Sequence, residues 1–292
     1  MIEARDGSLA LGDGRRLAYR DWGDRHGRPV VLLHGAPGSH RFHPDPDATA
    51  SVGVRLISFD RPGFGASDRR AGRSLLDTPP DVAALADHLE LDRFAIAGVS
   101  AGGPHALACA VVLGPRVDRV AVASMPGPLD EVAGAWAALP DRIRIAAERA
   151  RVDAPGSVRG VVRHMERYVA EPARYLQGGP PADRAALVDA RWREMLLADI
   201  TEALGPGAAG FADDMVALWR PWGVRLADVG AAVQVWHGAQ DTRAAADFEC
   251  LSARLRRARP AVWPDQGHYG VLARWADVLT GLVRPPEVGA DA

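Results

Sequence analysis

Ser100 stands at the centre of Gly98-Val99-Ser100-Ala101-Gly102, between an apolar run at 94–98 and an Ala/Leu-rich stretch at 103–113. A strand, a sharp turn and a helix in that order are the context in which G-x-S-x-G marks a nucleophile. A serine at the tip of such a turn is held in a strained backbone conformation that exposes its hydroxyl, and only small neighbours let strand and helix pass so closely. The pattern therefore predicts that Ser100 is a nucleophile.

A carboxylate and an imidazole follow two later apolar runs. Asp241 lies in the loop after the run at 232–237, and His268 follows the run at 261–264. Catalytic groups of open α/β sheets gather at the carboxyl ends of the strands. A serine hydroxyl becomes a good nucleophile when an imidazole accepts its proton, and a carboxylate on the other ring nitrogen holds the required tautomer. These two residues are therefore the expected partners of Ser100.

Two backbone N–H groups are candidates for stabilising an oxyanion. The Gly/Pro-rich loop after the run at 29–33 can aim the N–H of Ala36 into the crevice at the strand ends. The N–H of Ala101 lies at a helix N-terminus, which favours developing negative charge. We expect Ala36 and Ala101 to form an oxyanion hole.

Alternation of strands and helices positions these residues. A β-hairpin is expected over 8–22. Short apolar runs are typical of buried parallel strands, and they lie at 29–33, 55–59, 94–98, 117–124, 232–237 and 261–264. Helical patterns lie between or after them, at 81–90, 103–113, 244–257 and 271–283. The sequence predicts an α/β fold with a doubly wound, mostly parallel sheet.

The interval 127–229 lacks strand patterns and reads as helices separated by proline and glycine. Because its helical stretches have their own apolar faces, we expect an inserted all-helical lid rather than a solvated linker. The expected division is a hydrolase-type core at 1–126 and 230–292 with the lid at 127–229. Candidates for lining a substrate pocket are His34, Trp136, Trp192, Trp219, Trp222 and Tyr269, although packing is the alternative for each.

Four motifs in order resemble those of the α/β-hydrolase superfamily, in particular its lid-bearing serine hydrolases. They are an H-G-x-P-G loop at 34–38, a D-R-P-G-[FY]-G-x-S segment at 60–67, the serine turn, and the chain order Ser, Asp, His. The resemblance implies that Ser100 is the nucleophile, His268 the general base and acid, and Asp241 the orienting carboxylate. It also implies an oxyanion hole formed by Ala36 and Ala101. Asp130 is a rival for the carboxylate, because some members take it from an earlier strand end.

Neither a cofactor nor a metal is expected. His40 and His43 have a spacing that could suit a metal, but no carboxylates stand at the usual offsets and there is no H-E-x-x-H. We expect these histidines in a loop or on a helix surface. All 35 basic residues are arginine, so Schiff-base and Walker-type lysine chemistry is excluded.

Composition is that of an ordinary soluble globular protein, and the hydrolase resemblance implies a small-molecule substrate. The net charge of −2 gives no electrostatic reason to expect nucleic acid or a membrane surface as partner. The first residues form no apolar leader, so a cytoplasmic location is expected. The oligomeric state stays open.

Three classes of function remain in view. The first is a serine hydrolase that cleaves a small, largely apolar carboxylic ester, thioester or lactone through an acyl-enzyme. The second keeps the triad for C–C bond hydrolysis, acyl transfer or peracid formation, although Ala36 fits poorly with the oxyanion loops usual in C–C hydrolases and aminopeptidases. The third is a non-hydrolytic binding or cyclase module on the same scaffold, in a biosynthetic pathway.

Overall fold

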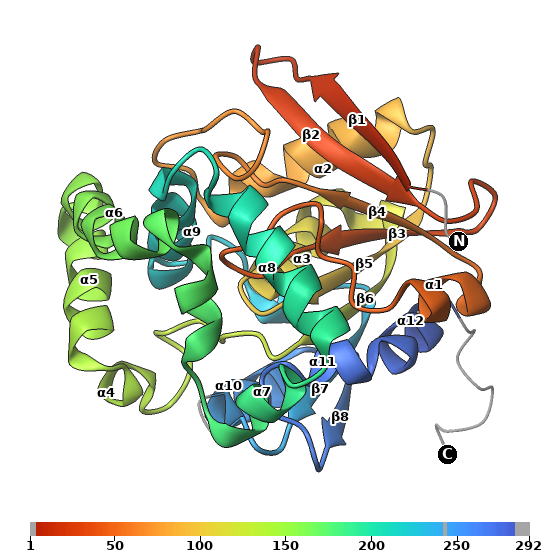
Figure 1. Cartoon of the computed structure of the whole chain (residues 1–292). Coiled ribbons are helices and arrows are strands. Elements are labelled where there is room, and N and C mark those ends of the chain that lie inside the picture. The colour runs from red at the N-terminus through yellow and green to blue at the C-terminus, as the bar shows by residue number, and fades with distance from the viewer. Residues whose placement is uncertain (1–3, 242–243, 284–292) are drawn as a thin grey trace.

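The computed structural model describes residues 4–241 and 244–283, and within them eight strands form one sheet in the order β1-β2-β4-β3-β5-β6-β7-β8 (Figure 1). The strands are β1 (Ala4–Ala10), β2 (Arg16–Trp22), β3 (Arg28–Leu33), β4 (Val54–Phe59), β5 (Phe94–Val99), β6 (Val117–Ala123), β7 (Ala232–Gly238) and β8 (Ala258–Trp263). The β1–β2 and β2–β4 pairs are antiparallel, and the pairs from β4 to β8 are parallel. The predicted mostly parallel α/β sheet is confirmed.

Helices cover both faces of this sheet. On one face α2 (Thr78–His88), α3 (Gly102–Leu113) and α10 (Ala245–Arg254) pack in a core cluster with β5 and β6. On the other face α1 (Pro46–Val52), α11 (Gly270–Ala273) and α12 (Trp275–Val283) pack in a second cluster. All six residues of β5 are buried, as expected for a central strand with helices on both sides.

The chain between β6 and β7 is helical, as predicted, and contains no strand in residues 124–231. Its helices are α4 (Ala135–Ala138), α5 (Asp141–Val152), α6 (Ala154–Ala170), α7 (Pro181–Ala186), α8 (Ala190–Leu204) and α9 (Ala209–Trp219). Residues of α6, α8 and α9 form a third apolar cluster around Phe64, which belongs to the loop after β4. The end of the segment, from Ala217 to Val229, packs instead in the core beside α2 and α3. That the segment acts as a lid stays a prediction.

Helix α1 has clear end signals that the sequence interpretation missed. Asp45 accepts a hydrogen bond from the N–H of Ala48, Pro46 is the first helical residue, and Gly53 ends the helix with a φ of 73°. A capping side chain, an early proline and a left-handed glycine are the usual signature of a short helix.

Two predicted elements near the C-terminal end differ from the structure. The helix expected over 271–283 is broken at Arg274, where the backbone leaves the helical region. The indole of Trp275 then donates to Thr49 Oγ1 on α1 (3.1 Å), which ties α12 to its neighbour. Strand β8 begins at Ala258 and is largely exposed rather than buried, because it lies at the sheet edge and pairs only with β7.

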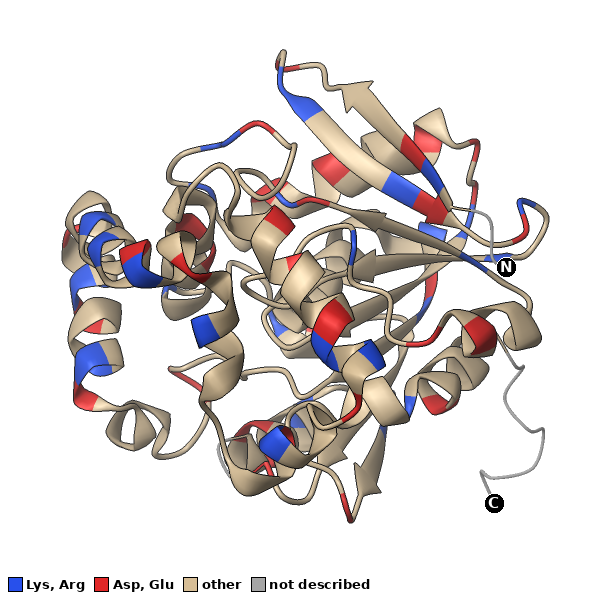
Figure 2. Cartoon of the chain, in the orientation of Figure 1, with Lys and Arg blue, Asp and Glu red and all other residues tan. Residues whose placement is uncertain are grey.

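Charged residues of both signs are interspersed over the described chain. Figure 2 shows acidic and basic residues mixed along α5 and α6 and along the β1–β2 hairpin. Of the helices in the described residues, none is long and apolar enough to cross a membrane.

Candidate active site

The turn between β5 and α3 has the geometry of an exposed serine elbow. Ser100 has a φ of 51°, in the left-handed region that a non-glycine residue rarely adopts. A Cβ on Gly98 would lie 2.8 Å from the carbonyl oxygen of Gly102, and a Cβ on Gly102 would overlap the carbonyl oxygen of Leu33. The glycines are therefore required by the close passage of α3 over β3 and β5.

Three side chains from separate strand ends form a continuous hydrogen-bonded chain. The Nδ1 of His268 lies 2.7 Å from Asp241 Oδ2, and its Nε2 lies 3.1 Å from Ser100 Oγ. The Asp241 carboxylate is 1% exposed and the His268 ring 24% exposed. Because an ionised carboxylate only accepts, Nδ1–H donates to Asp241 and Nε2 is left to accept from the serine hydroxyl. The structure thus brings together the three residues selected from the sequence.

The loop after β3 lies directly against the serine. A Cβ on Gly35 would be 3.6 Å from Ser100 Cβ. Ala36 follows in this loop, and Ala101 is the N-cap residue of α3. Neither N–H has a hydrogen-bond acceptor among the described residues. Both N–H groups therefore remain candidates for the predicted oxyanion hole.

His34 braces this loop and does not line a pocket, which corrects the sequence-based assignment. It is fully buried, its Nδ1 lies 2.7 Å from the carbonyl oxygen of Gly35, and its Nε2 accepts from the backbone N–H of Arg61 (3.2 Å). These two contacts fix the Nδ1–H tautomer. Burial, together with the charge of Arg61, holds the pKa of His34 well below its usual value.

A buried network of charged residues, centred on Arg61 and Asp214, holds the same loop in place through hydrogen bonds. The guanidinium of Arg61 donates to the carbonyl oxygens of His34 and Gly35 and pairs with Asp214 of α9 at 2.6 Å. Asp214 also pairs with Arg73 at 2.5 Å and contacts His105 Nε2 at 3.1 Å.

The neighbouring charges keep Asp214 ionised, and burial keeps His105 neutral. Burial alone would raise the pKa of Asp214, but Arg61 and Arg73 hold that pKa well below its usual value. Burial lowers the pKa of His105 to about 4, so its ring is neutral and donates Nε2–H to Asp214 while Nδ1 accepts from Thr78. Sequence reasoning missed this network, although an acidic residue inside the apolar pattern at 211–219 was a signal of it.

The aromatic pocket candidates lie in several different surroundings. Tyr269 packs edge-on against His268, with ring centroids 6.0 Å apart. Trp192 and Trp219 pack against the second and third apolar clusters respectively. Trp222 is buried in the main core and donates to the carbonyl of Leu218, so its assignment as a pocket residue is corrected to packing.

Trp136 and Asp130 lie together in a separate contact. The indole of Trp136 donates to Asp130 (3.3 Å), and the guanidinium of Arg151 lies over the Trp136 ring and pairs with Asp130 at 2.6 Å. The hydrogen bonds from Arg151 lower the pKa of Asp130. The Asp130 carboxylate therefore binds Trp136 and Arg151, and Asp241 is the carboxylate that contacts His268.

Tyr175 is a further residue at the site that the sequence did not single out. Its hydroxyl donates to the carbonyl oxygen of Ala36 at 3.3 Å. It stands in the helical segment between β6 and β7, in the turn Pro172–Gln177. Its contact ties this segment to the loop that carries one of the two free N–H groups.

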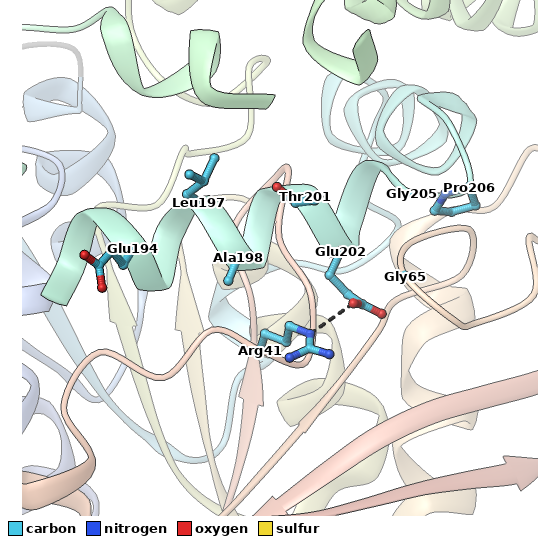
Figure 3. Close-up of a pocket in the computed structure, with 9 residues that line it drawn as sticks. All are labelled: Arg41, Gly65, Glu194, Leu197, Ala198, Thr201, Glu202, Gly205 and Pro206. Atoms are coloured by element: carbon cyan, nitrogen blue, oxygen red, sulfur yellow. Dashed lines mark hydrogen bonds and ion pairs between the residues drawn. The ribbon is translucent and has the colours of Figure 1, made fainter. Parts of the chain in front are cut away.

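Two surface hollows lie away from the serine. One, of about 590 Å³, is lined by residues of α8 and by Arg41, Gly65 and Pro206 (Figure 3). The other, of about 540 Å³, is lined mainly by residues of α6, α9 and the loop at 69–72. The residues that line these two hollows include neither Ser100 nor His268, so the candidate site rests on its hydrogen-bonded side chains.

Comparison with known proteins agrees with this geometry. A family model described as "Alpha/beta hydrolase family" matches residues 30–280. The chain is 36% identical over 115 residues to a proline iminopeptidase of Xanthomonas citri, covering 36% of this chain and 35% of the relative. It is 38% identical over 99 residues to a non-heme chloroperoxidase of Streptomyces lividans, covering 33% of this chain and 36% of the relative. The matches span about a third of the length of these curated relatives.

Solved structures resemble the whole described fold. A hydrolase from Pseudomonas aeruginosa PA01 has a TM-score of 0.70 at 24% identity, covering 96% of this chain and 99% of that chain. The enol-lactonase from Burkholderia xenovorans LB400 has a TM-score of 0.64 at 21% identity, covering 95% and 98%. At these identities the likeness establishes the fold.

Proposed function

The chain belongs to the alpha/beta hydrolase family, and from that premise we propose that it is a serine hydrolase cleaving a small, largely apolar ester, thioester or lactone. The observation that carries the proposal is the hydrogen-bonded chain from Ser100 through His268 to Asp241. A hydroxyl, an imidazole and a buried carboxylate in this arrangement are the parts of a nucleophilic acyl-transfer site.

Acylation begins when Ser100 Oγ attacks the substrate carbonyl carbon. As the new C–O bond forms, the serine proton moves to Nε2 of His268, and Asp241 stabilises the resulting imidazolium. The carbonyl oxygen becomes an oxyanion beside the N–H groups of Ala36 and Ala101, each worth about 3 kcal/mol in the transition state. Collapse breaks the bond to the leaving group, which takes the proton from His268.

Deacylation repeats these steps with water as the nucleophile. Water gives a proton to Nε2 of His268 as it attacks the acyl-enzyme, and the proton then returns to Ser100 Oγ as the acid departs. The helical segment between β6 and β7 supplies Tyr175 at the Ala36 loop, which supports its role as a lid over this chemistry.

The apolar neighbours of Ala36 support a small apolar acyl group. Ala36 and Met215 each pack against both the main core cluster and the cluster formed by α6, α8 and α9. Tyr175 belongs to the latter group as well. A carbonyl placed at Ser100 would therefore have aliphatic and aromatic surface on the side of Ala36, where an apolar substituent is favoured.

The test is covalent labelling and ester turnover by Ser100→Ala against a matched serine variant. Ser124→Ala is the control, because Ser124 directly follows the neighbouring strand β6 and has the same φ of 51°. We expect labelling by a fluorophosphonate and turnover of short p-nitrophenyl esters to disappear in Ser100→Ala and to persist in Ser124→Ala. Undiminished turnover in Ser100→Ala would overturn the proposal. Tight ligand binding that Ser100→Ala leaves unchanged, with no labelling by a fluorophosphonate, would favour a binding or cyclase module.

Peracid formation is the second candidate, favoured by the similarity to the Streptomyces lividans chloroperoxidase. Here hydrogen peroxide replaces water as the nucleophile on an acetyl-enzyme, so that acetate and peroxide give peracetic acid and water. Its test is peracid-dependent halogenation in acetate buffer with added peroxide. Proline p-nitroanilide belongs in the same panel, because of the proline iminopeptidase similarity. Partitioning of the acyl group to an added alcohol would indicate acyl transfer, and turnover of a β-diketone would indicate C–C hydrolysis.

A further inference from the structure

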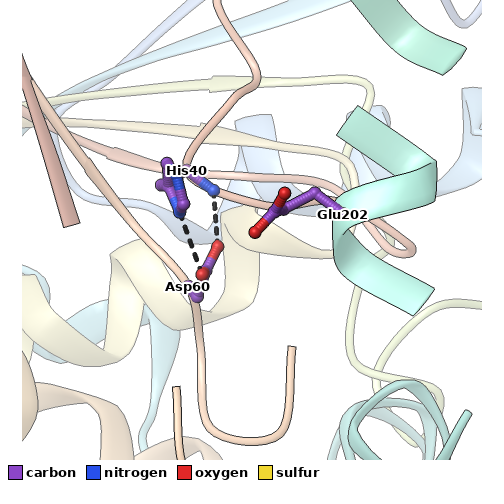
Figure 4. Close-up of side chains that lie close together, drawn as sticks. All are labelled: His40, Asp60 and Glu202. Atoms are coloured by element: carbon purple, nitrogen blue, oxygen red, sulfur yellow. Dashed lines mark hydrogen bonds and ion pairs between the residues drawn. The ribbon is translucent and has the colours of Figure 1, made fainter. Parts of the chain in front are cut away.

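Three potential metal ligands meet on the side of the fold where α8 rests on the loops after β3 and β4. They are His40, Asp60 and Glu202, and one donor atom from each lies within 4.8 Å of those of the others (Figure 4). His40 Nδ1 lies 2.9 Å from Asp60 Oδ2. The side chains of His40 and Asp60 are 8% and 0% exposed, and that of Glu202 is 29% exposed.

The imidazole of His40 has an unused donor atom directed into this cluster. Its Nδ1 lies 2.9 Å from Asp60 Oδ2, at ion-pair distance, but this buried atom has no hydrogen-bond partner among the described residues. A buried ring nitrogen without a hydrogen bond costs free energy, which a bound cation would recover. The 2.9 Å between His40 Nδ1 and Asp60 Oδ2 is close to the separation of about 3.3 Å expected for two ligands that each bind an ion at about 2 Å, and the Glu202 oxygen, within 4.8 Å of both, has to move closer to complete the set.

Asp60 is fixed in place to act as a ligand. Its Oδ1 accepts from the backbone N–H of His40 at 2.7 Å, and its Oδ2 accepts from that of Ala66 at 2.9 Å. Each carboxylate oxygen has a second lone pair that these bonds leave available. Backbone donors of this kind orient a ligating carboxylate.

Glu202 completes the set at the solvent side. Its carboxylate now pairs with Arg41 at 3.0 Å, but the Arg41 side chain is 42% exposed and can turn into water. Exposed ion pairs of this kind contribute little to stability, so a dication would displace the guanidinium at little cost. The 590 Å³ hollow is lined by Arg41, Gly65 and Glu202, and it gives an ion a path from solvent (Figure 3).

We propose that His40, Asp60 and Glu202 form a site for Zn²⁺, with water in the fourth position. One imidazole nitrogen and two carboxylates are ligands that Zn²⁺ accepts in tetrahedral geometry. The ion joins the loop after β3, the end of β4 and helix α8, so it fastens the helical segment to the sheet next to the loop at 34–38. No carboxylate stands at the usual metal-ligand offsets from His40 and His43 in the sequence, because Asp60 and Glu202 reach His40 from other parts of the chain.

The experiment titrates the metal-free, untagged full-length chain with Zn²⁺ by calorimetry and with Co²⁺ by visible absorbance. We expect one ion per chain, an absorption spectrum of four-coordinate Co²⁺ that Zn²⁺ abolishes, and a higher melting temperature with Zn²⁺. Glu202→Gln keeps an acceptor for Arg41 and should weaken Co²⁺ binding by at least about tenfold. Arg41→Gln removes the competing cation and should tighten it.

Glu194→Gln is the matched control, because Glu194 lies on the same helix and lines the same hollow. It should bind Co²⁺ like the wild type. Melting temperatures measured without metal establish that each variant is folded. Absence of saturable binding in the wild type, or equal affinity in Glu202→Gln and the wild type, would overturn the proposal. A ratio of several ions per chain with no four-coordinate spectrum would do so as well.

Discussion

Removing the negative charge of Asp214 should destabilise the protein strongly. This carboxylate is fully buried and is the counterion of two buried guanidinium groups, Arg61 and Arg73. In Asp214→Asn both cations would stay buried without a charged partner. Removing one partner of a buried ion pair costs about 3–5 kcal/mol, because the remaining charge cannot return to water. That range corresponds to a roughly hundred- to several-thousand-fold larger unfolding equilibrium constant.

The adjacent residue provides the control. Asp213 is also buried, but its partner Arg69 is 41% exposed and can be hydrated when the carboxylate is removed. We therefore expect Asp213→Asn to cost only about 1 kcal/mol. The measurement is the urea midpoint of both variants and the wild type at pH 7, with an unchanged slope showing that the difference is one of stability.

A functional effect should accompany the loss of stability. Arg61 holds the carbonyl oxygens of His34 and Gly35, so a displaced guanidinium would loosen the loop that carries the N–H of Ala36. Under conditions where Asp214→Asn is folded, kcat should fall more than KM changes, since the oxyanion is present only in the transition state. Equal urea midpoints for Asp214→Asn and Asp213→Asn would refute the reasoning from burial.

Three other outcomes follow from particular residues. Gly102→Ala should abolish fluorophosphonate labelling and lower the melting temperature, because its Cβ would overlap the carbonyl oxygen of Leu33. The control is Gly160→Ala on α6, where a Cβ meets no atom within 4 Å, and this substitution should be neutral or stabilising by up to about 1 kcal/mol. Burial lowers the pKa of His43 and of His105 to about 4, so the unfolded chain binds more protons than the folded chain between pH 6.5 and 4. Stability should therefore fall as the pH drops through that window, and His43→Gln should flatten the dependence of the urea midpoint on pH. A flatter dependence in the wild type than in the variant would count against this reasoning. Burial raises the pKa of Asp199 to about 8, so the folded chain holds an extra proton from about pH 4 to 8, and stability should fall as the pH rises through this window. The free energy of unfolding of Asp199→Asn relative to that of the wild type should therefore be higher at pH 8 than at pH 5. A lower relative value at pH 8 would contradict the raised pKa.

Local signals were sufficient for most of the sheet and for the reactive side chains. Runs at 29–33 and 94–98 are apolar throughout, the run at 55–59 is interrupted only by Arg55 and Ser58, and each became a largely buried strand of the sheet. Ser100 directly follows β5 and His268 lies in the loop after β8, so chain order and strand ends were enough to select them as candidates. Periodicity failed at β8, because an edge strand pairs on one side and carries polar residues.

The contacts that hold the site in shape depend on packing between distant segments. Arg61 and Asp214 stand in a loop and in α9, and His40 and His43, expected near the surface, are buried where α1 and α8 pack against the strand ends. Trp222 is in the core, while Tyr269 contacts His268. The spacing of these residues in the sequence does not predict their contacts, because each contact depends on how helices from one part of the chain cover loops from another.

The sequence alone selected the candidate nucleophile, base and carboxylate and predicted the sheet that carries them, since turn geometry and apolar periodicity are local properties of the chain. Tertiary structure decided which groups surround that centre. It placed a buried charge network under the loop at 34–38 and a cluster of three potential metal ligands beside α8. The physical reason is that burial and charge pairing arise only when segments far apart in the chain pack together.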